Sequence, residues 1–95
     1  MRVLMQMKWP SATVEQYESL RKNVNWEGDI PPGAVCHFSG FSTDALYVSD
    51  VWESEADMNA FLQHRLMPEV KKMGIPGQPE IIVIPLHALF TPGLK

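Results

Sequence analysis

Residues 34–73 have the sequence AVCHFSGFSTDALYVSDVWESEADMNAFLQHRLMPEVKKM, and this stretch decides the fold. Val35, His37 and Ser39 alternate with side chains of the opposite face, as in a strand, and residues 46–52 alternate in the same way. A short segment of turn-forming residues separates the two strands, so they must form an antiparallel hairpin. Ser54 then begins a helix, with Asp57 at the acidic position three residues later. The stretch therefore predicts a hairpin followed directly by a helix.

The segment before this hairpin supplies a strand, a helix and a loop. Residues 2–8 alternate as a strand does, and Trp9-Pro10 ends it because proline offers no N–H to a sheet. Thr13 begins a helix through a capping box with Gln16, and we expect the helix to end near residues 23–25. Residues 26–33 (WEGDIPPG) contain too much glycine and proline for a regular element, so they form a loop.

The segment after the hairpin completes the second helix and adds a last strand. Pro68 should kink or split the helix, and Gly74 should end it. Residues 80–90 (EIIVIPLHALF) are almost all apolar, which predicts a last strand buried on both faces. Pro85 lies inside this run and requires an edge position or a bulge there.

The resulting order, β-α-β-β-α-β, is that of the ferredoxin-like unit, an α+β fold. We expect a four-stranded antiparallel sheet with two helices on one face, in a single domain that spans residues 1–95. The other face would carry apolar side chains such as Val35 or Leu46, depending on which face each strand presents. Such a face should not stay in water, so we predict that two copies stack sheet to sheet as a homodimer.

Composition excludes several classes of function. The net charge is −3 and the basic residues are scattered, which argues against a nucleic-acid partner and against an anionic membrane surface. Cys36 is the single cysteine, so it forms no internal disulfide and is expected to be a small core residue. The first eight residues lack the apolar core of a secretory signal, and the cytoplasm is the expected compartment.

The chain resembles the dimeric α/β-barrel superfamily, and within it the branch named for antibiotic-biosynthesis monooxygenases. The resemblance covers nearly the whole chain and rests on Val51-Trp52-Glu53-Ser54, Phe61, Arg65, Pro68, Gly74 and the apolar strand ending at Leu89. It implies the fold just described, but members of the superfamily carry out many reactions. They include cofactor-free oxygenases of aromatic polyketides, haem-degrading enzymes, cyclases and isomerases. Haem degradation is disfavoured, because Phe61 and Lys71 stand where the resemblance would place a tryptophan and a ligating histidine.

His37 and Asp50 are the leading candidates for chemistry. The hairpin should place His37 across from Ser49 or Asp50, and a His–Asp pair orients an imidazole for proton abstraction. Asp50 also needs a partner, because it lies inside an apolar strand. The alternative is that the pair only ties the hairpin together.

Four further residues complete the list of candidates. His87 could point into the same cavity from the last strand, as a third catalytic residue or as a hydrogen-bonded core histidine. Tyr47, Trp26 and Phe61 are the candidate substrate-binding residues, although Trp26 could simply plug the end of the core. The histidines have no short fixed spacing and no clustered carboxylates, so the sequence predicts no metal site, and no cofactor is implied.

Two hypotheses about function follow. The first is a cofactor-independent, monooxygenase-like enzyme that acts on an aromatic or polyketide-like compound in a cavity between sheet and helices. The second is a non-catalytic module for small-ligand binding or assembly, whose dimer is its main feature.

Overall fold

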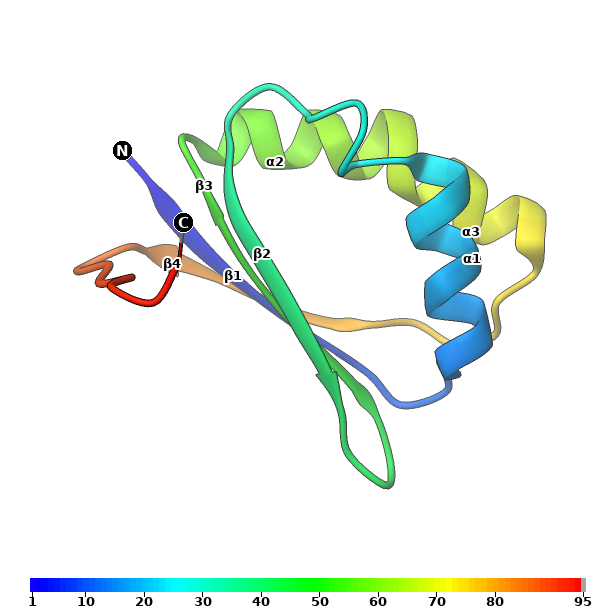
Figure 1. Ribbon diagram of the computed structural model, residues 1–95. Coiled ribbons are helices and arrows are strands. Elements are labelled where there is room, and N and C mark those ends of the chain that lie inside the picture. Colours follow the sequence, from blue (N-terminus) through cyan, green and yellow to red (C-terminus); the bar gives the residue numbers. More distant parts are fainter. Residues whose placement is uncertain (95) are drawn as a thin grey trace.

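The computed structural model describes residues 1–94 and contains one sheet with helices on one side of it (Figure 1). The strands are β1 (Val3–Trp9), β2 (Ala34–Phe41), β3 (Leu46–Trp52) and β4 (Glu80–Pro85). Their order in the sheet is β2-β3-β1-β4, and every neighbouring pair is antiparallel. The predicted ferredoxin-like, α+β architecture is therefore confirmed.

The register fixes which face of each strand meets the helices. Met5 of β1 lies opposite Asp50 of β3 and Val83 of β4, and His37 of β2 lies opposite Asp50. A register shift between Ala34 and Cys36 does not disturb this face beyond the start of β2. The helix-facing side chains of β1 and β3 form the core of the protein, namely Val3, Met5, Met7, Trp9, Leu46, Val48 and Trp52. Leu46 therefore belongs to the buried face and not to the open one.

The helices begin and end where local chemistry allows them to. Helix α1 (Val14–Val24) has the predicted capping box: the Gln16 backbone N–H donates to Thr13 Oγ1, and the Thr13 backbone N–H donates to Gln16 Oε1. The second helical segment comprises α2 (Glu55–Phe61), a π-helical turn η1 (Leu62–Leu66) and α3 (Met67–Met73). Pro68 lies in the first turn of α3, so the interruption falls just before this proline, as predicted. Gly74 ends the helix with a positive φ of 69°.

The last strand is shorter than the sequence pattern predicted. Strand β4 ends at Pro85, whereas residues 80–90 were expected to continue it. The proline nitrogen carries no hydrogen, and only the Leu86 N–H, bound to the Arg2 carbonyl, extends the ladder beyond it. Five of the six β4 residues are also exposed, because β4 is an edge strand and its outer face is open in the single chain.

The open face of the sheet carries large apolar side chains. By register, Phe38, Tyr47, Ile82 and Ile84 all point away from the helices. Their exposed fractions are 61%, 43%, 58% and 47%, in the same order. Exposed apolar side chains on adjoining strands are the usual mark of an interaction surface.

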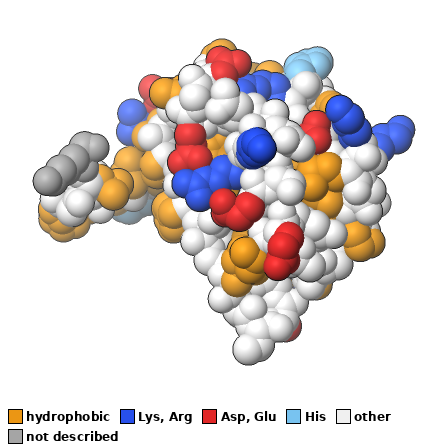
Figure 2. Space-filling view, turned by 45° about the vertical axis from the view of Figure 1, so that its right-hand side comes forward, with side chains coloured by type: hydrophobic (Ala, Val, Ile, Leu, Met, Phe, Trp, Pro, Cys, Tyr) orange, Lys and Arg blue, Asp and Glu red, His pale blue; other side chains and the backbone are white. Residues whose placement is uncertain are grey.

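Charged side chains are mixed on the face seen in Figure 2, where acidic and basic groups lie side by side with apolar patches between them. That face therefore offers no cationic surface of the kind that nucleic acids require. No helix in the described part of the chain has both the length and the apolar composition needed to cross a membrane.

Candidate functional site

The His37–Asp50 pair lies on the helix-facing side of the hairpin. His37 Nδ1 and Asp50 Oδ1 are 2.6 Å apart, and the Trp52 indole Nε1–H donates to Asp50 Oδ2 at 3.2 Å. The Asp50 side chain is 8% exposed and the His37 side chain 31% exposed. The hairpin register thus brings together the two residues that the sequence put forward, and Asp50 has the partners that a buried carboxylate needs.

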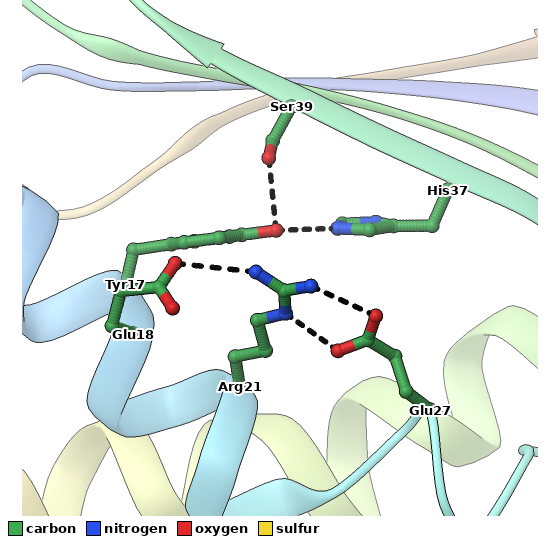
Figure 3. A network of polar contacts seen from close by, with 6 residues as sticks. All are labelled: Tyr17, Glu18, Arg21, Glu27, His37 and Ser39. Carbon is green, nitrogen blue, oxygen red and sulfur yellow. Dashed lines mark hydrogen bonds and ion pairs between the residues drawn. The ribbon is translucent and has the colours of Figure 1, made fainter.

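Tyr17 extends this pair into a longer chain of hydrogen bonds. Its hydroxyl lies 2.8 Å from His37 Nε2 and accepts a hydrogen bond from Ser39 Oγ at 2.9 Å. Figure 3 shows the Tyr17 hydroxyl between His37 and Ser39, with the two rings nearly coplanar. Burial raises the pKa of the Tyr17 phenol above its ordinary value of 10.0, so the hydroxyl keeps its proton at neutral pH.

One proton arrangement satisfies every member of the chain. An ionised Asp50 accepts from the Trp52 indole and from His37 Nδ1–H, and a neutral His37 accepts the Tyr17 hydroxyl proton at Nε2. The Tyr17 oxygen in turn accepts the Ser39 proton. In the described part of the chain, no buried side-chain nitrogen or oxygen lacks a partner. The arrangement makes the His37–Asp50 pair a unit with one negative charge next to the core.

Trp26 covers this unit from the loop between α1 and β2. Its ring lies 5.3 Å from the His37 ring and 5.9 Å from the Tyr17 ring, measured between centroids. Figure 1 shows the loop arching from the end of α1 toward the start of β2. Two contacts hold the start of the loop: Arg21 Nε and Nη2 bind the Glu27 carboxylate at 2.5 and 3.0 Å, and Arg65 Nη2 donates to the Val24 carbonyl at 2.9 Å. The paired guanidinium holds the pKa of the Glu27 carboxyl below its usual range.

Two cavities meet at the His37–Asp50 pair and at Trp26. The outer cavity has a volume of about 250 Å³ and lies beneath the loop, against the start of β2 and the end of β3. The inner cavity has a volume of about 40 Å³ and lies between the sheet, α1 and η1. The residues that line the outer cavity besides the shared three are Ile30, Pro31, Ala34, Val35, Cys36 and Trp52. Among the described residues, no lysine or arginine lines either cavity.

The other candidates from the sequence do not join this site. Tyr47 lies on the opposite face of the sheet, where it borders a separate concavity of about 510 Å³ with Gln6 and Ile82. Phe61 is buried and packs on Trp52, with 5.4 Å between ring centroids, away from both cavities. His87 follows the end of β4 and is exposed, so the shortened strand does not carry it toward His37.

Sequence reasoning missed Tyr17, Ser39 and the indole of Trp52. Tyr17 is one of the buried residues of α1 and Trp52 is a buried core residue, so the spacing of neither one indicates a polar role. A signal was present for Ser39, since alternation put it on the same face as His37, two residues along the strand. Residues 1–94 contain no group of three or more His, Cys, Asp or Glu side chains that could hold a metal ion.

Comparisons with known proteins agree on the fold. No family model matches the chain, and no curated protein matches it either. Among solved structures, a protein of unknown function from Nitrosomonas europaea is 14% identical with a TM-score of 0.74, over 97% of this chain and 95% of that one. SnoaB, a cofactor-independent oxygenase from Streptomyces nogalater, is 13% identical with a TM-score of 0.65, over 93% of this chain and 94% of that one.

A third structure is a monooxygenase from the gene ActVA-Orf6 of Streptomyces coelicolor, in complex with the ligand nanaomycin D. It is 18% identical with a TM-score of 0.63, over 96% of this chain and 92% of that one. Identities this low show the fold alone. This chain thus has the ferredoxin-like fold, and its structural neighbours include antibiotic-biosynthesis-monooxygenase-like proteins.

Proposed function

We propose that the protein is a cofactor-independent oxygenase that acts on a small hydroxyaromatic compound bound in the outer cavity. The observation that carries the proposal is the position of the His37–Asp50 pair, which lines the apolar outer cavity together with Trp26. The oxygenases among the structural neighbours support the same class of reaction.

The shape and charge of the outer cavity favour a compact neutral ligand. Its volume of about 250 Å³ falls below the range of roughly 300–1,000 Å³ that is usual for drug-sized ligands. An engineered apolar cavity of about 150 Å³ holds one benzene. A compound of one or two rings therefore suits the volume. Anionic compounds are disfavoured, because the ionised group at the wall is the Asp50 carboxylate.

The proposed reaction begins with proton transfer. The ligand hydroxyl gives its proton to the His37–Asp50 pair and neutralises the single negative charge of the pair. The electron-rich anion then gives electrons to O₂, and a C–O bond forms at a ring carbon that carries hydrogen. The peroxide anion takes the proton back from the His37–Asp50 pair, and loss of water from the resulting hydroperoxide leaves a ring carbonyl. One oxygen atom thus enters the product and the other leaves as water. For 1-naphthol the balance is C₁₀H₈O plus O₂ giving C₁₀H₆O₂ plus H₂O.

Oxygen uptake with a panel of hydroxynaphthalenes tests the proposal. Wild-type protein should consume one O₂ for each quinone formed, and His37→Ala should lose at least about a hundredfold in turnover, the usual scale for a positioned acid or base. His64→Ala is the matched control, because His64 is an exposed histidine of η1. Circular dichroism checks that both variants fold. Full turnover in His37→Ala would remove His37 from the reaction.

A second function is favoured by one specific observation. Each nitrogen and oxygen of the chain from Trp52 to Ser39 already has a partner within the protein. A site satisfied in this way suits a binding module that holds a small aromatic ligand without converting it. Saturable binding of 1-naphthol with no oxygen uptake would favour this module over the enzyme.

We also propose that two copies pair through the open sheet face. Phe38 on β2 and Ile82 and Ile84 on β4, the two edge strands of the sheet, offer apolar area that water would otherwise contact. A stable interface buries about 1,600 Å² in total, and a four-stranded sheet face is of that order. Such a pairing would cover Ile82 and Ile84, the apolar residues that β4 presents on the open face.

A further inference from the structure

The inner cavity has the size of a single small molecule. Its volume is about 40 Å³, whereas one water takes about 30 Å³ of the liquid and a benzene-binding cavity has about 150 Å³. No aromatic ring fits there, so the inner cavity cannot be an extension of the ligand site in the outer cavity.

The wall of the inner cavity is apolar around most of its circumference. Met5 and Met7 come from β1, Leu46 and Val48 from β3, and Leu20 from α1. The π-helical turn η1 contributes both of its end residues, Leu62 and Leu66. A π-helical turn within a helix is often found at a functional site, and this one closes the cavity on the helix side.

The polar groups at the other end of the cavity are already bonded to one another: every N–H and O–H there is used, and only lone pairs on the Tyr17 and Asp50 oxygens remain. The Tyr17 hydroxyl binds Ser39 and His37, both nitrogens of His37 are used, and each Asp50 oxygen already accepts one hydrogen bond. A buried water needs two to four polar partners, so an apolar cavity of this kind stays dry and takes up apolar molecules such as xenon.

We propose that the inner cavity is a binding site for one small apolar gas molecule, and that this gas is O₂. The identity of the gas rests on the proposed oxygenase function. Trp26, His37 and Asp50 line both cavities, so a gas molecule in the inner cavity lies one side chain away from an aromatic ligand in the outer cavity. The cavity would hold the oxidant next to the ligand.

Crystals of the full chain under xenon pressure test the site without any reaction. Wild-type crystals should contain one xenon atom among Leu46, Val48, Leu62 and Leu66. Leu66→Phe should contain none, because the larger ring fills the cavity. Leu66 is only partly buried and so can accept a larger side chain, and Leu62→Phe is a second filling variant. Met73→Phe is the matched control, since Met73 packs on the core from α3 and does not line the cavity. Ordered water in the wild-type cavity, or its lack of xenon, would overturn the proposal.

Kinetics assign the gas. Leu66→Phe should raise the KM for O₂ about threefold or more and leave kcat at saturating O₂ unchanged, whereas Met73→Phe should change neither. An unchanged KM for O₂ in a variant that has lost xenon would overturn O₂ as the occupant. The two proposals fail separately: turnover without xenon binding refutes only the gas site, whereas xenon binding without turnover refutes the oxygenase, and O₂ as the occupant with it, but leaves the apolar gas site.

Discussion

Removal of the Asp50 carboxylate should destabilise the protein by an amount that the structure allows us to work out. In Asp50→Ala, the Trp52 indole N–H loses its acceptor in a place where Trp52 is only 3% exposed. An unsatisfied buried donor costs about 1–3 kcal/mol. The lost bond to His37 adds less than about 1 kcal/mol, because the His37 side chain is 31% exposed and water can replace the carboxylate.

The sum is about 1–4 kcal/mol, which corresponds to a fall in Tm of roughly 5–30 °C for a domain of this size. Asp50→Asn should cost about half as much, since an amide oxygen can still accept from one of the two donors. Ser49→Ala is the matched control on the opposite face of β3, and it should stay within about 0.5 kcal/mol of wild type. Urea unfolding at one fixed protein concentration measures all three variants. If Asp50→Ala and Ser49→Ala were equally stable, the carboxylate would not satisfy the Trp52 indole, and the hydrogen-bond chain would be wrong.

Three further predictions concern the phenol, the loop and the open face. Tyr17→Phe should make the free energy of unfolding less dependent on pH in the alkaline range. The raised pKa of the wild-type phenol contributes stability below pH 10, and this stability is lost as the pH rises through the pKa of the folded protein. Urea unfolding between about pH 8 and 11 should show this loss in wild type only. Gly33→Ala should lower the Tm by roughly 5–15 °C, because Gly33 has a φ of 83° and an added Cβ would collide with the Asp57 carboxylate; a thermal melt like that of wild type would contradict the loop geometry. Ile82→Asp should convert a dimer into a species near the 10.8 kDa chain mass in sedimentation velocity, while Val14→Asp on the exposed side of α1 should not; a wild-type monomer would refute the pairing of open faces.

The parts of the site that follow strand periodicity could be predicted from the sequence. A period of two puts His37, Ser39 and Phe41 on one face of β2, and a short hairpin leaves few registers. The sequence therefore placed His37 across from Ser49 or Asp50, and the register in the structure selects Asp50. The bulge between Ala34 and Cys36 did not spoil the prediction, because it precedes His37.

The misassigned and missed residues depend on packing between elements. Tyr47 and Asp50 are three apart on β3, so alternation itself puts them on opposite faces, and one cavity cannot hold both. The Tyr17 hydroxyl contacts His37 across the space between α1 and β2. No local sequence pattern predicts the rotation of a helix about its axis relative to the sheet that it covers. His87 was placed on a strand that Pro85 ends, since an apolar run alone does not show where a ladder of hydrogen bonds stops.

A crystal structure of the protein soaked with 1-naphthol tests the central claim most directly. The account predicts the ligand in the outer cavity, against Trp26 and Val35, with its hydroxyl oxygen within about 3.2 Å of a His37 ring nitrogen or an Asp50 carboxylate oxygen. An outer cavity that stays empty while the ligand binds on the open sheet face near Tyr47 and Ile82 would contradict it.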